Sequence, residues 1–249
     1  MNDEEFKAYL EWDRKQTDER IEYFNHLNRK YGIQFVSAET IYRVFEEIVQ
    51  PTQLGFLPIR KGVYAQIVNN DITHLLKLVA LKGTLYTLKW GLSLSYVPHE
   101  WRKGLRWHKS FKSSQFDLFC LANEGVYHGA DWRELISYLI QTSNGEEYLR
   151  LTTKTMWGAL RQEVINWFSS TQTLQSVLQK ADEQVKSKPN YHSPEPLLVY
   201  AFTLARLGEL EKAKDTVAKV FSSSKEPLEY EQNLKLALEK IHITPLPNS

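Results

Sequence analysis

The chain has 249 residues and a formal net charge of +1 at pH 7, so no overall charge draws it to nucleic acid or to an acidic membrane surface. Its hydrophobic content of 42% and charged content of 24% are ordinary for a globular protein. A single cysteine, Cys120, excludes an intrachain disulfide, and no apolar run is long enough for a transmembrane helix. The acidic start, residues 1–5, lacks the apolar segment of a secretory signal. We therefore expect a cytoplasmic protein without a membrane partner.

Two helices are expected at the start of the chain. Residues 3–31 favour a long helix, but Asp13 and Thr17 interrupt its apolar stripe, so we expect this helix to be partly exposed or bent. Ser37 is a good N-cap for a second helix, which ends near Pro51. The stripe of the first helix consists of Phe6, Leu10, Thr17, Ile21, Phe24 and Tyr31.

A strand-rich block follows. Apolar residues at every second position from Tyr86 to Tyr96 predict a strand with one apolar and one polar face, with Trp90 in the core. Turn residues at 69–71 and 82–84 separate this strand from its predecessors. The block is therefore expected to form an antiparallel meander. Its predicted strands are 56–68, 72–81, 86–96 and 115–121.

The period of the apolar residues changes near residue 142, after which they recur every three or four positions, as in packed helices. We expect an α+β protein: a small antiparallel meander sheet packed with helices, followed by an all-helical carboxyl-terminal part. The predicted domains are 1–142 and 143–249. The predicted helices are 131–140, opened by a capping box of Asp131 and Glu134, then 146–169, 172–187, 195–207, 209–222 and 227–241.

Residues 197–220 resemble one tetratricopeptide repeat. Ala201 and Ala213 would let two helices approach closely, and Gly208 would make the turn between them. Helices from 145 to 186 could be degenerate neighbours. Stable solenoids need about three repeats, so an ordinary helical hairpin is the alternative.

The densest basic stretch runs from residue 101 to residue 112 and interleaves aromatic side chains. Arginine beside tryptophan is a good interface anchor, and basic side chains with aromatic faces also suit nucleic acid. The alternative is an edge strand or loop, in which lysines prevent edge-to-edge pairing and tryptophans pack inward. The candidate partner-binding residues are Trp101, Arg102, Arg106, Trp107, Lys109 and Lys112.

No motif indicates catalysis. The seven histidines lack metal-ligand spacing, and Cys120 lies in an apolar strand context that is typical of an inert thiol. Phosphate-binding glycine loops and a nucleophile elbow are missing. The pairs Glu46–Glu47 and Glu146–Glu147 are interpreted as solvated helix positions. The sequence thus assigns no catalytic residue, metal ligand or cofactor, and it leaves open whether the protein is an enzyme.

Residues 40–125 resemble a bacterial family known only as a domain of unknown function. The resemblance lies in the segments 45–51, 54–56 and 70–72, in the basic pair Arg60 and Lys61, and in Leu88-Lys89-Trp90-Gly91-Leu92. It implies an α+β fold and a bacterial origin, and it transfers no residue role.

The leading hypothesis is a non-enzymatic bacterial protein that binds another protein, of an adaptor or toxin-neutralising type. It depends on the missing catalytic motifs, the repeat-like hairpin and the clustering of tryptophan with arginine. A nucleic-acid-binding protein that uses residues 101–112 is the second hypothesis. An enzyme whose site is assembled from scattered residues is the third.

Overall fold

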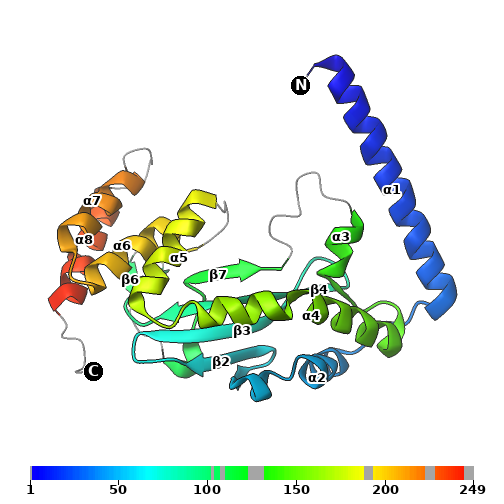
Figure 1. Ribbon diagram of the computed structural model, residues 1–249, viewed down its shortest axis with the longest axis horizontal. Coiled ribbons are helices and arrows are strands. Elements are labelled where there is room, and N and C mark those ends of the chain that lie inside the picture. The colour runs from blue at the N-terminus through cyan, green and yellow to red at the C-terminus, as the bar shows by residue number, and fades with distance from the viewer. Residues whose placement is uncertain are drawn as a thin grey trace. The chain divides into compact units, whose positions relative to one another are not determined.

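The computed structural model describes residues 2–101, 104–106, 110–122, 132–187, 193–221 and 228–243. Within these ranges the expected α+β fold is confirmed, with an antiparallel sheet and a helical carboxyl-terminal part (Figure 1). None of the described helices combines the length and the apolarity needed to span a membrane.

The helices begin with the long α1 (Asp3–Tyr31) and α2 (Ala38–Val49), as the sequence predicts. Ser37 caps α2, since its hydroxyl oxygen accepts a hydrogen bond from the Thr40 N–H at 3.2 Å. A short 3₁₀ helix, η1 (Pro51–Leu54), follows directly. The later helices are α3 (Trp132–Ser137), α4 (Gly145–Ser169), α5 (Leu174–Ser187), α6 (Pro196–Arg206), α7 (Leu210–Phe221) and α8 (Leu228–Ile243).

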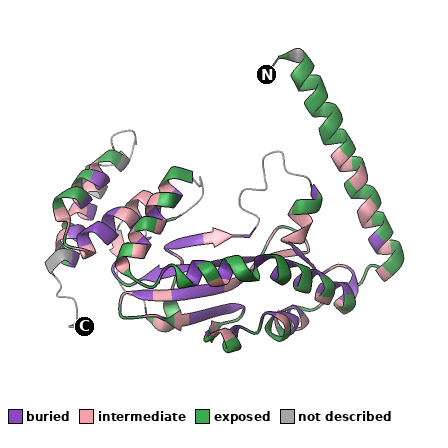
Figure 2. Ribbon diagram, in the orientation of Figure 1, coloured by how far each residue is buried: buried purple, intermediate pink, exposed green. Residues whose placement is uncertain are grey.

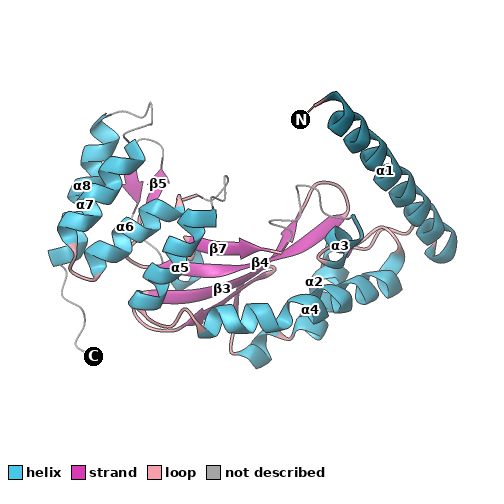
Figure 3. Cartoon of the chain, turned by 45° about the horizontal axis from the view of Figure 1, so that its top comes forward, coloured by secondary structure: helices cyan, strands magenta, loops and turns pink. Residues whose placement is uncertain are grey.

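The main sheet has the strand order β1-β2-β3-β4-β7, and β8 pairs with the first two residues of β4. A separate two-stranded sheet is made of β5 and β6 (Figure 3). The strands are β1 (Leu57–Arg60), β2 (Val63–Ile67), β3 (Ile72–Ala80), β4 (Leu85–Leu94), β5 (His99–Trp101), β6 (Gly104–Arg106), β7 (Leu118–Leu121) and β8 (Ile140–Gln141).

The first predicted strand, 56–68, is wrong as a single element. Gly62 has a φ of 67° and turns the chain between β1 and β2, so the segment is itself an antiparallel hairpin. The turn predicted at 69–71 is confirmed. The Asn69 side-chain oxygen accepts hydrogen bonds from the N–H groups of Asp71 and Ile72, both at 2.9 Å, which is the local bonding that favours asparagine in turns.

The strand β4 has the expected apolar and polar faces, and both are largely buried. Thr87 is fully buried, and its hydroxyl donates a hydrogen bond to the Tyr138 carbonyl oxygen at 3.0 Å. Gly91 lies against β7, where a Cβ would come within 2.2 Å of the Leu118 carbonyl oxygen. The small residues Thr87 and Gly91 thus let neighbouring segments pack closely against this face of β4. Trp90 is in the core, as predicted.

Two further boundaries differ from the prediction. The strand expected over 115–121 begins only at Leu118, because Asp117 turns inward and its carboxylate accepts the Leu94 N–H at 2.6 Å. The helix expected over 131–140 ends at Ser137, and the buried, β-branched Ile140 pairs with β4 instead. Asp131, the predicted cap of that helix, lies outside the described residues.

The chain divides into two compact units, each made of three stretches. One unit contains residues 1–54, 77–89 and 121–162, and the other contains 55–76, 90–120 and 163–249. The predicted boundary at 142/143 would separate two domains that fold independently of each other. That boundary stays a prediction.

The second unit contains the four helices α5 to α8. The two helices α6 and α7 form the predicted hairpin: Ala201 and Ala213 are fully buried, and Gly208 turns the chain with a φ of 91°. Each consecutive pair from α5 to α8 is in contact, and α6 also contacts α8. A helical hairpin is therefore confirmed, whereas the resemblance to a tetratricopeptide repeat stays a prediction.

Candidate functional site

The amino-terminal half of α1 exposes an apolar surface. Every side chain from residue 4 to residue 15 is exposed, including four large apolar ones (Figure 2). Tyr9 and Leu10 are 49% exposed, Phe6 is 48% exposed and Trp12 is 37% exposed. Phe6, Tyr9, Leu10 and Asp13 recur at helical spacing and so share one side of the helix, with Trp12 at its edge. We call these five residues the amino-terminal face.

This half of the helix is stabilised locally. Asn2 and Glu5 form a capping box, in which the Asn2 side chain accepts the Glu5 N–H at 2.8 Å and the Glu5 carboxylate accepts the Asn2 N–H at 2.9 Å. The acidic residues of the first turns also suit the positive end of the helix dipole. The apolar side chains are thus presented on a capped helix.

The carboxyl-terminal half of α1 is anchored to its own unit. Leu27 is buried, and the Tyr23 hydroxyl lies 2.8 Å from the Tyr148 hydroxyl of α4. The Tyr23 ring also lies 5.1 Å from the Trp132 ring of α3. Burial, with the hydrogen bond to Tyr23, raises the pKa of the Tyr148 hydroxyl, so this hydroxyl keeps its proton at neutral pH. These contacts fix the base of the helix.

A buried asparagine fixes the end of α1. The Asn144 side-chain nitrogen donates hydrogen bonds to the Asn28 side-chain oxygen at 2.9 Å and to the Gly32 carbonyl oxygen at 2.8 Å. Arg133 of α3 adds an ion pair with Glu19 at 2.8 Å. The anchored part of α1 therefore uses polar partners as well as apolar burial, whereas no side chain in the described part of the chain buries the apolar residues of the amino-terminal face.

The charge of the amino-terminal face is negative. The sequence from residue 3 to residue 13 holds five carboxylates and one lysine. Asp13 lies three residues after Leu10 and four after Tyr9, so it belongs to the same side of the helix. No described residue gives the exposed Asp13 carboxylate an ion pair or a hydrogen bond. An unpaired carboxylate among aromatic side chains can accept a cation from a binding partner.

The partner-binding residues predicted from the sequence are not part of the amino-terminal face. Trp101 and Arg106 lie in the paired strands β5 and β6, and Arg102, Trp107 and Lys109 lie outside the described residues. Lys112 is exposed in a 3₁₀ turn at 111–113. This surface therefore stays a prediction. The exposure of α1 is one of the two outcomes that the interruption of its apolar stripe predicts.

The other candidate residues are accounted for structurally. His74 is fully buried, and its Nε2 lies 3.2 Å from both the carbonyl oxygen and the hydroxyl of Thr171. Burial lowers the pKa of His74 to about 4, which keeps the ring neutral. Cys120 is only half-buried, with its Sγ 3.8 Å from the Gln184 side-chain nitrogen. Among the described residues no group of three or more His, Cys, Asp or Glu side chains could hold a metal ion.

The glutamates expected to be solvated are partly engaged. Glu47 of α2 and Glu146 of α4 alternate with Arg43 and Arg150 in a closed ring of ion pairs, with N–O distances of 2.7 to 2.9 Å. Arg150, with Arg43, lowers the pKa of the Glu47 carboxyl, and Arg43, with Arg150, lowers that of Glu146. The ring joins two helices on the surface. Two of its pairs have the i, i+4 spacing expected within one helix, whereas the two pairs between α2 and α4 leave no local pattern in the sequence.

Comparison with protein-family models, with curated proteins and with solved structures finds no match to this chain. The resemblance of residues 40–125 to a bacterial family therefore stays a prediction. The functional argument depends on the chain's own surfaces.

Proposed function

We propose that this protein is a non-enzymatic interaction module of the adaptor type, which binds another protein through the amino-terminal face of α1. The single observation that carries the proposal is the exposure of Phe6, Tyr9, Leu10 and Trp12 together on one capped helix. Helices that dock into an apolar groove present anchors three and four residues apart, which is the spacing of Tyr9 and Leu10 from Phe6. Tyrosine and tryptophan are also the side chains that most often dominate binding energy.

The charge of the face defines the partner. A groove that accepts Phe6, Tyr9 and Leu10 must be apolar at its centre. Because Asp13 lies on the same side and the surrounding segment is acidic, the rim of that groove carries lysine or arginine. An anionic membrane surface is a poor alternative, since helices that bind such surfaces are rich in lysine and arginine on their polar side.

Site-specific photo-crosslinking in the native host tests this proposal. A photoreactive amino acid replaces Tyr9 in one variant and Asp18 in the control, because Asp18 is exposed on the opposite side of the same helix. We expect one protein to be crosslinked from position 9 and not from position 18. Adding Trp12→Ala to the position 9 variant should abolish that adduct.

Binding measurements with the purified partner then test which side chains form the interface. Its affinity for the wild-type chain should fall when Tyr9→Ala and Trp12→Ala are combined, and its groove should carry a basic rim. Equal crosslinking from positions 9 and 18, or an adduct with nucleic acid, would contradict the proposal. A dimer in light scattering that Trp12→Ala dissociates would assign the face to a second copy instead.

A further inference from the structure

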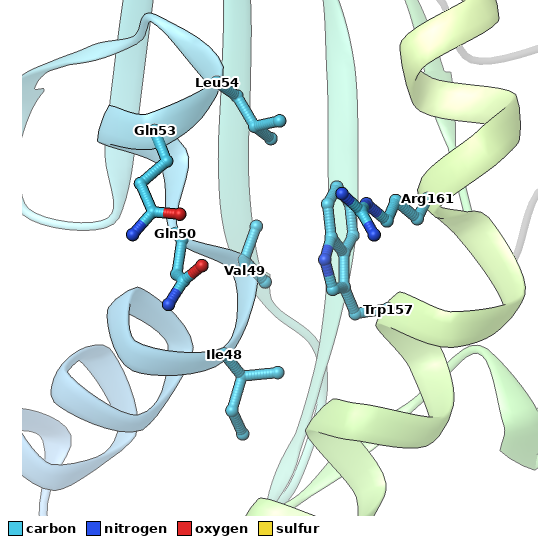
Figure 4. A pocket seen from close by; sticks show the side chains of 7 residues that line it. All are labelled: Ile48, Val49, Gln50, Gln53, Leu54, Trp157 and Arg161. Carbon is cyan, nitrogen blue, oxygen red and sulfur yellow. The ribbon is translucent and has the colours of Figure 1, made fainter.

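Two further surfaces of the unit that contains α1 contrast with each other. One is a pocket between α4 and the end of α2 with η1 (Figure 4). Its polar side chains Gln50, Gln53 and Arg161 are exposed, and the two glutamine amides turn away from Arg161, so these groups do not converge on a ligand. The other surface is residues 33–36, which link α1 to α2 and which we call the linking segment.

The linking segment is held in an extended conformation along one of its edges. The Gln34 N–H donates to the Ser143 carbonyl oxygen at 2.8 Å, and the Gly145 N–H donates to the Gln34 carbonyl oxygen at 2.8 Å, in parallel pairing. Two residues later, the Val36 N–H donates to the Thr142 carbonyl oxygen at 3.0 Å. Bonding from every second residue to the same stretch of chain is the pattern of a β-strand.

The opposite edge of the linking segment is free. Because successive residues of an extended chain direct their backbone groups to opposite edges, the N–H and C=O of Phe35 point away from residues 142–145. No residue in the described part of the chain gives the backbone of Ile33 or Phe35 a hydrogen bond. Phe35 is 70% exposed and Ile33 is 67% exposed, the two largest values among the large apolar residues that the structure describes.

Both ends of the linking segment are fixed within the chain itself. At one end Gly32 turns the chain with a φ of 74°, and its carbonyl oxygen accepts a hydrogen bond from the Asn144 side chain at 2.8 Å. At the other end Ser37 caps α2. A free edge that is already extended loses less conformational entropy when a partner binds it.

We propose that this free edge binds an extended segment of a partner protein as an added antiparallel strand. Its main-chain groups match those of another extended backbone, and strand addition to an exposed edge is a recurring mode of peptide recognition. Phe35 presents its N–H and its C=O to the same side, so one partner residue in antiparallel register exchanges both bonds with it. Ile33 and Phe35 then pair with apolar side chains at alternate positions of the partner.

The charges beside the free edge define the partner segment further. Arg29 and Lys30 are exposed in the last turn of α1, and no residue in the described part of the chain gives either of them an ion pair. In an antiparallel arrangement the carboxyl-terminal end of the added strand lies beside Ile33, on the side of α1. We therefore expect aspartate or glutamate at that end. Glu39, exposed at the start of α2, disfavours an acidic residue at the other end.

Peptide display on the full chain tests the proposal. A library of random peptides is selected on the wild type and counter-selected on a variant that combines Ile33→Ser and Phe35→Ser, which should fold because both side chains are exposed. We expect enriched peptides with apolar residues at alternate positions, followed by aspartate or glutamate. Their affinity should fall by about tenfold or more in the double variant. Leu151→Ser, which removes an exposed apolar side chain from α4, should leave the affinity unchanged.

Hydrogen exchange distinguishes an added strand from an apolar contact alone. When an enriched peptide binds, exchange of the Phe35 amide should slow by about tenfold or more, whereas the Gln34 amide, already bonded to Ser143, should change little. N-methylation of the peptide should abolish binding at alternate positions only, because only every second peptide N–H faces the edge.

Three results would overturn the proposal. One is that no peptide prefers the wild type to the double variant. Another is a bound peptide that leaves exchange of the Phe35 amide unchanged, and the third is a peptide that N-methylation weakens equally at adjacent positions. Combining Tyr9→Ala with Trp12→Ala should leave peptide binding unchanged, because the linking segment does not include the amino-terminal face. The two proposals therefore fail separately.

Discussion

The two halves of α1 carry the same kind of apolar stripe and meet different environments. In the carboxyl-terminal half, Leu27 is buried and Tyr23 finds the hydroxyl of Tyr148. In the amino-terminal half, Tyr9 and Leu10 are about as apolar and remain half exposed. An apolar stripe therefore predicts that a helix will bury one face. It does not tell whether the chain itself covers that face, and in the carboxyl-terminal half the hydrogen bond between Tyr23 and Tyr148 shows that it does.

A matched pair of leucine truncations gives the largest expected contrast. Leu27→Ala should lower the free energy of unfolding by about 2–4 kcal/mol, because it removes a buried side chain and leaves a cavity. Leu10→Ala should change it by less than about 0.5 kcal/mol, since Leu10 is exposed. Chemical denaturation of both variants measures the difference. Equal destabilisation would mean that the amino-terminal half is also packed in solution.

Acidification tests the second unit separately from α1. The pKa of His74 falls from 6.5 to about 4 on folding, because burial disfavours the charged ring. The unfolded chain therefore binds a proton between these values and the folded chain does not, so stability is complete above pH 6.5 and is lost as the pH falls toward 4. The loss should reach about 3 kcal/mol. His74→Gln should reduce the dependence of the free energy of unfolding on pH between pH 4 and 6.5. An unchanged dependence would exclude His74 as the cause.

Removal of single hydroxyl groups gives the smallest contrast. Tyr23→Phe should lower the free energy of unfolding by about 1 kcal/mol, because it leaves the Tyr148 hydroxyl without its partner. Tyr9→Phe should have no measurable effect, since Tyr9 is on the exposed face. Thermal unfolding of the two variants compares them directly. A loss in Tyr9→Phe would indicate a contact of the amino-terminal half within the chain.

Local signals made much of the fold predictable. Ser37 and Asn69 bond to nearby backbone groups, so their roles as a cap and as a turn follow from sequence alone. The sequence did not predict the hairpin at Gly62, because the residues on either side of it are equally compatible with one continuous strand. The short β8 was missed because Ile140 continues the apolar pattern of the preceding helix. Its pairing with β4 depends on residues more than fifty positions away.

The sites were less predictable than the fold. The interruption of the stripe at Asp13 indicated exposure of α1, but the sequence could not tell exposure from a bend. The free edge of the linking segment depends on hydrogen bonds to residues 142–145, which are about a hundred positions away in the chain. Spacing rules describe one element at a time, so a site shared by distant elements leaves no local pattern.

Charge reversal at position 13 tests the central claim most directly. The measurement is the dissociation constant between this chain and the partner crosslinked from position 9, compared for the wild type and Asp13→Lys. We predict that Asp13→Lys weakens binding by about tenfold or more, and that changing one rim lysine or arginine of the partner to glutamate restores it. Unchanged affinity in Asp13→Lys, together with unchanged affinity when Tyr9→Ala and Trp12→Ala are combined, would contradict the account.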